Sequence, residues 1–442
     1  MMNSLARIIF LAKTKIAMSK LNKQYLEAEY DLKNRDVSKL NFERRKSLID
    51  HAIQNSDFYK EKYKNHLSLG KGIIDEKDFC QLPVLTRTDL IGNFNKIKSV
   101  GLKSPDYRRA SSSGSTGSPV TVLHDQRRPE TPTRWRILNW WGVKPWENQA
   151  FIYRYERPIE KRFFNSIIWW PTRRIFFAAA DFNEKKIEKF IRRFNRIKPA
   201  LVQGYVDVVF EFALYLLDHN IEIEAPKMVW VTSAPLFEEQ REIIEKAFGA
   251  PVCDQYGNTE ILLIAAECRS QNGLHIMQDK VHVEFVDENN KPLPPNKTGK
   301  ILLTDLTNYA FPLIRYEIGD EGKALDFSCS CGVRLPLMEN VKGRQTKNIK
   351  TPSGLLIRGE HIMAMFNGYM KFFKEIQLYQ KSDYSVCLYY VSRKASYGAE
   401  EASKMIELLR KRTRYEIQLE HKRVKKIKRY NVKTPLIVNE FT

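Results

Sequence analysis

Residues 227–257 read KMVWVTSAPLFEEQREIIEKAFGAPVCDQYG, and this stretch decides the fold class. A buried strand over 227–234 is followed by a helix over 237–248 that stops at Gly249, and a second strand begins after Pro251. Strand, helix and strand in this order are typical of a βαβ unit. The stretch therefore predicts an α/β fold with a parallel sheet, whose ligands bind at the carboxyl ends of the strands.

A second stretch, residues 110–122, reads ASSSGSTGSPVTV and suits neither a packed helix nor a packed strand. Its glycines permit positive φ and close approach of the backbone, and its hydroxyl and N–H groups are donors for an anion. The composition predicts a phosphate-binding loop, and a flexible Ser/Gly linker is the alternative. The loop is not the P-loop of G-x-x-x-x-G-K-[ST] type, because no Lys-Ser or Lys-Thr follows the second glycine.

Outward from these two stretches, the chain divides into three predicted parts. Residues 1–90 are expected to form an N-terminal helical segment of a large domain, and residues 91–344 its core, in which the short strands of 274–325 make a β subdomain. Residues 345–442 are expected to form a small α+β domain. Its predicted elements are a hairpin at 348–357, a helix from about Glu360, a strand pair within 373–391 and a helix over about 400–412. Within 274–325, residues 275–285 predict one strand.

The N-terminal residues 5–24 are basic and contain no acidic residue, which predicts one amphipathic helix. Such a helix packs on its own domain, or it contacts a membrane surface or another subunit. No run of about 18 apolar residues occurs, so no transmembrane helix is predicted.

The 442 residues include 73 Lys and Arg against 52 Asp and Glu, and the net charge of +21 indicates an anionic partner. Nucleotide phosphates, nucleic acid, an acidic glycan and an anionic membrane surface are the open alternatives. Six cysteines are too few for a disulfide scaffold, so a reducing compartment is predicted. We expect a cytoplasmic protein, with peripheral contact at the inner membrane face as a further expectation.

Four tryptophans lie close together in the sequence, at Trp135, Trp140, Trp141 and Trp146. Clustered tryptophans are most often core residues. The alternative is an apolar ligand pocket, because indole rings supply large rigid faces and a polar N–H.

Five short stretches follow one another in a fixed order: SSGSTGSP at 112–119, TSAPL at 232–236, DQYGNTE at 254–260, TDL at 304–306 with PLIRYEIGD at 312–320, and KGRQTKNIK at 342–350. Together they resemble the adenylate-forming (AMP-binding) enzymes, and within them the phenylacetate-CoA ligase-like and CapK-like branch of polysaccharide biosynthesis. The resemblance covers about residues 80–442. Each stretch alone is a weak signal, and the specificity comes from their common order.

The resemblance implies an ATP-dependent ligase with Mg²⁺ that converts a small carboxylic acid into an acyl-adenylate. The acyl group then passes to CoA, or to an amine or sugar acceptor in surface polysaccharide assembly, while the small C-terminal domain moves about a hinge near Thr346. The implied residue roles are these: Ser113, Gly114, Ser115, Thr116 and Gly117 cradle phosphates; Ser233 and Ala234 line the adenine slot; Tyr256 packs on adenine; Thr259 meets the α-phosphate; Glu260 binds Mg²⁺; Asp320 takes the ribose hydroxyls; and Arg344 supports them. Taken singly, Glu260 and Asp320 are also explained as solvated turn carboxylates.

This chain departs from the family pattern at three places. Val120 stands where many members have a lysine, and the acidic pair usual after the hinge is replaced by residues 345–347, Gln-Thr-Lys. The late lysine that bridges the substrate carboxylate and the α-phosphate matches Lys433, with Lys428 as the rival position. The alternative for the whole chain is a non-catalytic protein of the same fold that binds nucleic acid or another anionic polymer. The basic residues are spread along the chain, so no specific nucleic acid is expected.

Cysteine and histidine residues predict a second kind of site. Cys268, His275, Cys329 and Cys331 offer three thiolates and an imidazole, which suit a structural Zn²⁺ ion with four protein ligands. Reduced structural cysteines are the alternative.

Overall fold

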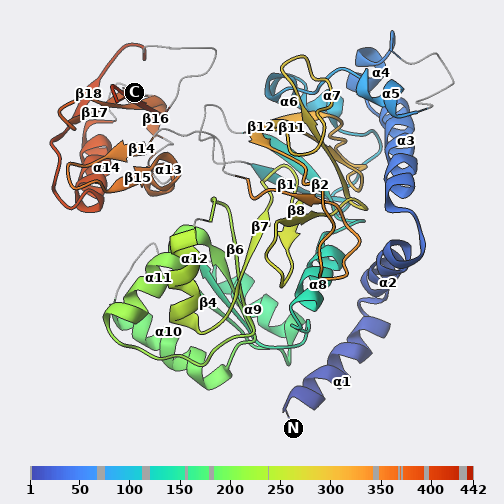
Figure 1. The fold of residues 1–442 in the computed structure, drawn as a ribbon, viewed down its shortest axis with the longest axis horizontal. Helices are drawn as coiled ribbons and strands as arrows, with labels where there is room; N and C mark the ends of the chain where they lie inside the picture. Colours follow the sequence, from blue (N-terminus) through green and yellow to red (C-terminus); the bar gives the residue numbers. More distant parts are fainter. Residues whose placement is uncertain are drawn as a thin grey trace. The chain divides into compact units, whose positions relative to one another are not determined.

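The computed structural model describes residues 2–441 except 67–74, 112–119, 155–157, 179–183, 237, 342–347, 367–368, 370–371, 393–397 and 428–435. The chain forms two compact units (Figure 1). One comprises Met1–Ala110 and Thr121–Lys342, and Gly343–Thr442 belong to the other. The predicted boundary at 90/91 falls inside the first unit, and the one at 344/345 lies outside the described residues.

The core of the first unit is an eight-stranded mixed sheet. Its strands are β3 (Gln149–Tyr153), β4 (Arg174–Ala178), β5 (Leu201–Tyr205), β6 (Met228–Thr232), β7 (Val252–Tyr256), β8 (Ala265–Glu267), β9 (Leu274–Ile276) and β13 (Leu337–Met338). They lie in the order β13-β9-β8-β7-β6-β5-β3-β4. Strands β3 to β7 are parallel to one another, whereas β8, β9 and β13 continue the sheet from β7 in antiparallel pairs. The predicted parallel sheet is confirmed.

Helices cover both faces of this sheet. They are α8 (Thr131–Trp140), α9 (Ile159–Trp169), α10 (Glu184–Ile197), α11 (Val206–Asp218) and α12 (Glu238–Phe248). Helices α10, α11 and α12 bury their apolar stripes on the face that carries Ile152, Val202 and Val229. Helix α12 ends before Gly249, whose φ of 59° suits glycine at a helix end, so the predicted helix at 237–248 is confirmed for its described residues. Helix α8 lies on the opposite face, where the Arg134 guanidinium is 4.9 Å from the ring of Trp230.

The N-terminal part is helical. Its helices are α1 (Met2–Lys15), α2 (Ser19–Asn34), α3 (Val37–Asn55), α4 (Asp57–Lys62), α5 (Glu76–Cys80), α6 (Arg87–Gly92) and α7 (Phe94–Ile97). The prediction of one helix over 5–24 is wrong, because the chain turns between Lys15 and Ser19. The Met18 N–H donates to the Lys13 carbonyl over 2.8 Å and closes this turn.

The β subdomain is an antiparallel sheet of β10 (Val281–Val286), β11 (Gly299–Asp305) and β12 (Tyr316–Gly322). The prediction of one strand over 275–285 is wrong, because β9 and β10 belong to different sheets. A turn separates them, in which the Val281 N–H donates to the Met277 carbonyl over 2.8 Å. A further pair, β1 (Tyr107–Ser111) and β2 (Thr121–Asp125), flanks the Ser/Gly loop.

The second unit is a small α+β structure. It contains β14 (Asn348–Lys350), β15 (Leu356–Arg358), α13 (Gly359–Phe366), β16 (Phe373–Gln380), β17 (Val386–Ser392), α14 (Ala399–Arg412), β18 (Leu419–Arg423) and β19 (Ile437–Asn439). A four-stranded sheet in the order β18-β17-β16-β19 packs against α13 and α14 around Phe366, Leu378 and Met405. The predicted hairpin, strand pair and both helices of this part are confirmed.

Candidate active site

The carboxyl ends of β6 and β7 bring two predicted stretches together. Thr232 pairs with Gln255 in the parallel ladder, and its hydroxyl donates to the Gln255 carbonyl over 3.1 Å. Ser233 and Tyr256 therefore follow at the same edge of the sheet. Ser233 has a φ of 75°, which for a residue other than glycine costs about 1–3 kcal/mol and is typical of sites that the surrounding structure holds in place. Ala234 is half-buried beside it.

Tyr256 and Asp320 meet at this edge. The Tyr256 hydroxyl donates to Asp320 Oδ2 over 2.8 Å, although β7 and β12 belong to different sheets. The two residues that the resemblance assigns to adenine and to ribose are therefore in direct contact.

A tight turn after β7 positions Thr259 and Glu260. A Cβ on Gly257 would lie 2.9 Å from the Leu263 nitrogen, so only glycine fits there without a backbone shift. The Ile261 N–H donates to Asn258 Oδ1 over 2.7 Å, which closes the turn. Glu260 is only 4% exposed and lies 3.5 Å from the Tyr316 hydroxyl, which donates to it. It is therefore not a solvated turn carboxylate.

His124 was missed by the sequence analysis. It lies on β2, directly after the Ser/Gly loop, and its Nε2 is 2.9 Å from the Thr259 carbonyl. Burial lowers the pKa of His124, so the neutral ring donates its Nε2 proton to this carbonyl. The exit strand of the loop is thus attached to the turn that carries Glu260. A histidine close after the loop was the available signal, but it stands outside the matched stretches.

A cavity of about 210 Å³ lies on the α8 face of the sheet. Aromatic rings, two arginines and two glutamines surround it: Thr131, Arg134, Trp135, Leu138, Pro145, Gln149, Phe151, Tyr153, Trp169, Arg174 and Gln203. None of these described lining residues is acidic. The side-chain oxygens of Gln149 and Gln203 are buried without a hydrogen-bond partner. The cavity therefore offers hydrogen-bond acceptors and positive charge between flat apolar walls.

Of the four clustered tryptophans, Trp135 lines this cavity, while Trp141 is a core residue that is 1% exposed.

Several predicted site residues lie outside the described residues. They are Ser113, Gly114, Ser115, Thr116, Gly117, Arg344, Lys428 and Lys433. The roles that the resemblance implies for them stay predictions.

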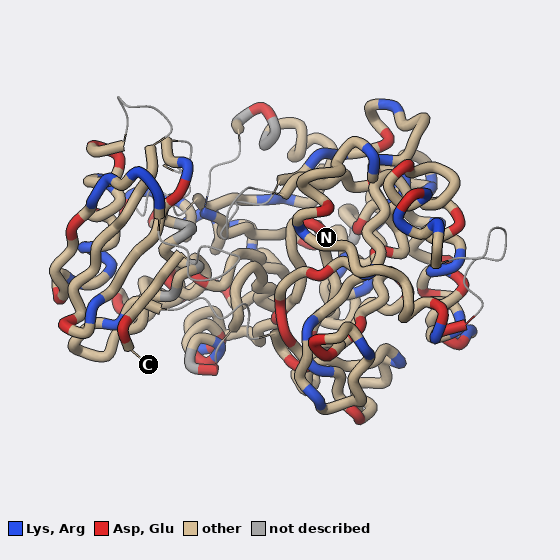
Figure 2. The backbone as a smooth tube through the Cα atoms, turned by 90° about the horizontal axis from the view of Figure 1, so that it is seen from above, with Lys and Arg blue, Asp and Glu red and all other residues tan. Residues whose placement is uncertain are grey.

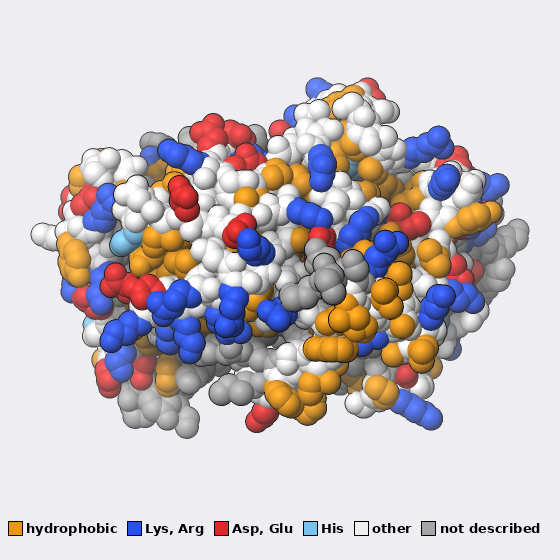
Figure 3. All heavy atoms as spheres, turned by 90° about the horizontal axis from the view of Figure 1, so that it is seen from below, with side chains coloured by type: hydrophobic (Ala, Val, Ile, Leu, Met, Phe, Trp, Pro, Cys, Tyr) orange, Lys and Arg blue, Asp and Glu red, His pale blue; other side chains and the backbone are white. Residues whose placement is uncertain are grey.

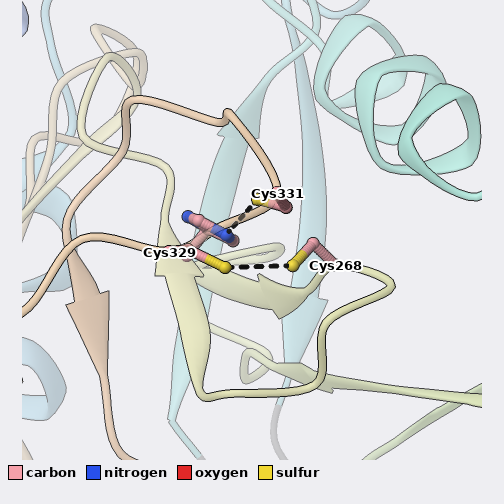
Figure 4. A group of neighbouring side chains, drawn as sticks. Cys268, Cys329 and Cys331 are labelled. Carbon is pink, nitrogen blue, oxygen red and sulfur yellow. Dashed lines mark hydrogen bonds between the residues drawn. The ribbon is translucent and has the colours of Figure 1, made fainter.

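The predicted zinc ligands converge (Figure 4). Cys268 follows β8, His275 lies on β9, and Cys329 and Cys331 come from the loop between β12 and β13. Their ligand atoms all lie within 4.8 Å of one another. The sulfurs of Cys268 and Cys329 are 3.6 Å apart, and the Cys331 sulfur is 3.3 Å from His275 Nε2.

This geometry fits a tetrahedral ion. With Zn–S at about 2.3 Å and Zn–N at about 2.0 Å, two sulfurs lie about 3.8 Å apart and a sulfur and a nitrogen about 3.5 Å apart. The remaining His275 nitrogen, Nδ1, lies 3.1 Å from the Leu335 carbonyl and donates to it, which directs the Nε2 lone pair toward the three sulfurs. The residues therefore fit Zn²⁺ with four protein ligands.

Comparisons with known proteins agree with the fold. No protein-family model matches the chain. The chain is 25% identical to Protein CapK of Staphylococcus aureus over an alignment of 318 residues. This alignment covers 70% of this chain and 68% of that protein. It is 24% identical to the phenylacetate-coenzyme A ligase of Escherichia coli K12 over an alignment of 347 residues. This alignment covers 74% of this chain and 74% of that ligase. The crystal structure of 2-hydroxyisobutyryl-CoA ligase in complex with 2-HIB-AMP and CoA matches with a TM-score of 0.65 and 18% identity, over 91% of this chain and 89% of that chain. The chain is therefore similar in sequence to CapK and to phenylacetate-coenzyme A ligases, and it shares the fold of a CoA ligase.

Three further findings concern the charges, the helices and the cysteines of the chain. Figure 2 shows Lys and Arg interspersed with Asp and Glu along the described backbone. In the described part of the chain, no helix has both the length and the apolar character needed to cross a bilayer. All six cysteines are free thiols.

Proposed function

We propose that this protein is a ligase that uses ATP to convert a small carboxylic acid into an acyl-adenylate and then passes the acyl group to CoA. One observation carries the proposal. The contact between Tyr256 and Asp320 lies at the carboxyl edge of the sheet, at the end of the strand that leads into the Thr259–Glu260 turn. The fold of a CoA ligase and the relatedness to phenylacetate-coenzyme A ligases support it.

In the proposed adenylation, a carboxylate oxygen of the acid attacks the α-phosphorus of ATP, and pyrophosphate leaves. Tyr256, with Ser233 and Ala234, would hold the adenine, and Asp320 the ribose hydroxyls. Thr259 would contact the α-phosphate. Glu260 would hold Mg²⁺, which neutralises charge that develops on the phosphoryl oxygens. The phosphate loop at Ser113–Gly117 and Arg344 keep the roles that the resemblance implies.

The cavity on the α8 face is the proposed place for the rest of the acid. It reaches Tyr153, whose ring is 5.1 Å from that of Tyr205 at the neighbouring strand end, so it extends toward the carboxyl edge. Flat walls favour a planar acid, and Arg134 and Arg174 favour one with an additional anionic or strongly polar group. The unpartnered oxygens of Gln149 and Gln203 favour a group that donates hydrogen bonds.

Two features of the proposal rest on the resemblance alone. An amine or sugar acceptor in surface polysaccharide assembly is the alternative to CoA. A movement of the second unit about the segment near Thr346 would exchange the residues that face the acid between the two half-reactions. We propose both as properties that CapK-like and phenylacetate-CoA ligase-like proteins imply for this chain.

Exchange of labelled pyrophosphate into ATP, measured with a panel of carboxylic acids, tests the proposal. We expect exchange only with the correct acid, and planar acids with a second anionic group are the first to try. Glu260→Gln and Asp320→Asn are each expected to reduce the exchange rate about a hundredfold or more, because a contact in the transition state contributes about 3–4 kcal/mol. Glu288→Gln, in an exposed turn, is the matched control and should leave the rate unchanged.

Wild-type exchange by folded Glu260→Gln or Asp320→Asn protein would show that the nucleotide site is assigned wrongly. If no acid supports exchange, and the protein instead binds DNA or RNA in a salt-dependent manner without binding ATP, the non-catalytic alternative is correct.

A further inference from the structure

Two helices that are far apart in the sequence present one apolar surface. Helices α1 and α9 lie at the lower edge of the first unit in Figure 1. Among the described residues, more than half of the exposed large hydrophobic side chains belong to these helices and the residues directly after them. We call this surface the apolar face. Its main members are Leu5, Ile8 and Ile16 together with Phe163, Phe164 and Trp170, which are between 55% and 80% exposed.

Lys13 joins the two parts of the apolar face. Its ammonium group donates to the carbonyl of Ile168 over 3.1 Å and to the carbonyl of Trp170, and it lies 5.9 Å from the indole ring of Trp170. The end of α9 therefore sits on the last turn of α1. The two sets of exposed side chains form one surface with a lysine between them.

Helix α1 is apolar on two opposite sides. Ala6 and Phe10 are buried on one side, where the Phe10 ring lies 5.6 Å from the rings of Trp135 and Trp146. Leu5, Ile8 and Ile16 follow at helical spacing on the other side and are exposed. Packing on its own domain thus explains one apolar side of α1 and leaves the other without a function.

Helix α9 has no buried residue among those described. Phe163 and Phe164 are 62% and 64% exposed, and Ile167 and Ile168 are each 55% exposed. Apolar side chains gathered on one surface to this extent mark interaction sites in soluble proteins. Trp170 stands next to a lysine, an arrangement that is typical of residues placed at a membrane–water interface.

The basic residues around the apolar face indicate which kind of partner it binds. The first 26 residues contain Arg7, Lys13, Lys15, Lys20 and Lys23 and no acidic residue. Helix α10 reaches the same lower edge in Figure 1, and its fourteen residues carry six Lys and Arg against two Glu. Figure 3, which views this edge from below, shows hydrophobic side chains gathered beside a band of basic side chains.

We infer that the apolar face docks on the surface of an anionic lipid bilayer. The exposed side chains of α1 and α9 enter the headgroup region, and the basic residues of α1 and α10 contact the lipid phosphates. A bilayer suits this surface better than a protein does, because the apolar face has basic residues along its margins and lies on helices rather than in a groove. The inference concerns location and does not depend on the proposed reaction.

Flotation of the full-length protein with lipid vesicles tests the inference. We expect binding to vesicles of phosphatidylcholine mixed with phosphatidylglycerol, and weak binding to phosphatidylcholine alone. The double variant Phe163→Ser, Phe164→Ser is expected to bind about tenfold or more weakly. Val100→Ser, which alters an exposed side chain remote in sequence from these helices, is the matched control and should bind like the wild type.

A second pair of variants tests the charge. Lys15→Glu with Lys189→Glu should weaken binding to the anionic vesicles, and Lys297→Glu in an exposed turn should not. Equal binding by the wild type and the double phenylalanine variant would overturn the inference. So would concentration-dependent self-association that the phenylalanine substitutions abolish in the absence of vesicle binding, since a second copy of the chain would then cover the apolar face.

Discussion

At the scale of single residues, the buried carboxyl group of Asp254, behind the candidate active site, has a raised pKa. Asp254 lies on β7, and its carboxylate accepts a hydrogen bond from Asn340 Nδ2 over 3.2 Å. Glu267 lies beside it and pairs with Arg241 over 2.7 Å. Burial, together with the negative charge of Glu267, raises the pKa of Asp254 from 3.8 to about 7.

This raised pKa predicts a fall in stability as the pH rises. The folded state keeps the proton on Asp254 up to about pH 7, whereas the unfolded state releases it near pH 4. The contribution of Asp254 to the free energy of unfolding is therefore full below about pH 4 and is lost as the pH rises toward 7. Asp254→Asn should remove this dependence, so that the variant gains stability relative to the wild type across this window.

Urea unfolding of both proteins at several pH values between about 4 and 8 measures the effect. Asp50→Asn, at an exposed position of α3, serves as the control and should follow the wild type. An unfolding free-energy difference between the Asp254→Asn variant and the wild type that stays constant with pH would contradict the prediction.

The sequence identified some residues of the candidate active site and missed others for physical reasons. Tyr256 and Asp320 stand in recognisable stretches, but their contact depends on how two sheets are placed. Arg174 and Gln203 carry no local signal, because they share a cavity only after β3, β4 and β5 have paired. His124 is fixed by a backbone carbonyl more than a hundred residues away in the chain.

At the scale of elements, periodic patterns correctly predicted those helices and strands that end at a glycine or at a polar turn. Gly249 ends α12, and the polar turn between β16 and β17 separates two apolar runs. The breaks between α1 and α2 and between β9 and β10 were missed because neither contains glycine or proline. The Lys280 ammonium group donates to the Leu262 carbonyl over 2.7 Å, so tertiary contacts hold the second break in place.

The cysteine and histidine cluster gives the prediction at this scale. We expect one zinc ion per chain in protein purified without added metal, and removal of the ion by a chelator should lower the melting temperature. His275→Ala and Cys331→Ser should each abolish stoichiometric binding, because each removes one of four ligands. Elemental analysis and thermal unfolding are the measurements.

Cys80→Ser is the matched control, since Cys80 is a free thiol outside the cluster, and this variant should retain the metal. Well-folded wild-type protein without stoichiometric zinc would show that the four side chains are reduced structural residues.

At the scale of the whole molecule, the prediction concerns the second unit. Lys433 is the proposed bridge between the substrate carboxylate and the α-phosphate, and such a lysine neutralises two anions that must approach each other. Lys433→Ala should therefore slow adenylate formation strongly and leave acyl transfer from a supplied acyl-adenylate unchanged. Lys428→Ala should change neither half-reaction.

Rapid-quench assays of the two half-reactions, run on both variants, decide between these lysines. A selective loss in Lys428→Ala would move the assignment to that position. Unchanged adenylation in both variants would mean that another cation acts, or that the second unit is not catalytic.

Helix α9 links the cavity to the apolar face. Trp169 forms a wall of the cavity, with the Arg174 guanidinium 3.6 Å from its ring, while the next residue, Trp170, is 59% exposed on the apolar face. A surface that immobilises Trp170 also immobilises the wall beside it. Binding equilibria that share an element are coupled in both directions by the same free energy. Under the two proposals made above, a bilayer would be an effector of acid binding, and an acid held in the cavity would change the attachment to lipid by the same factor.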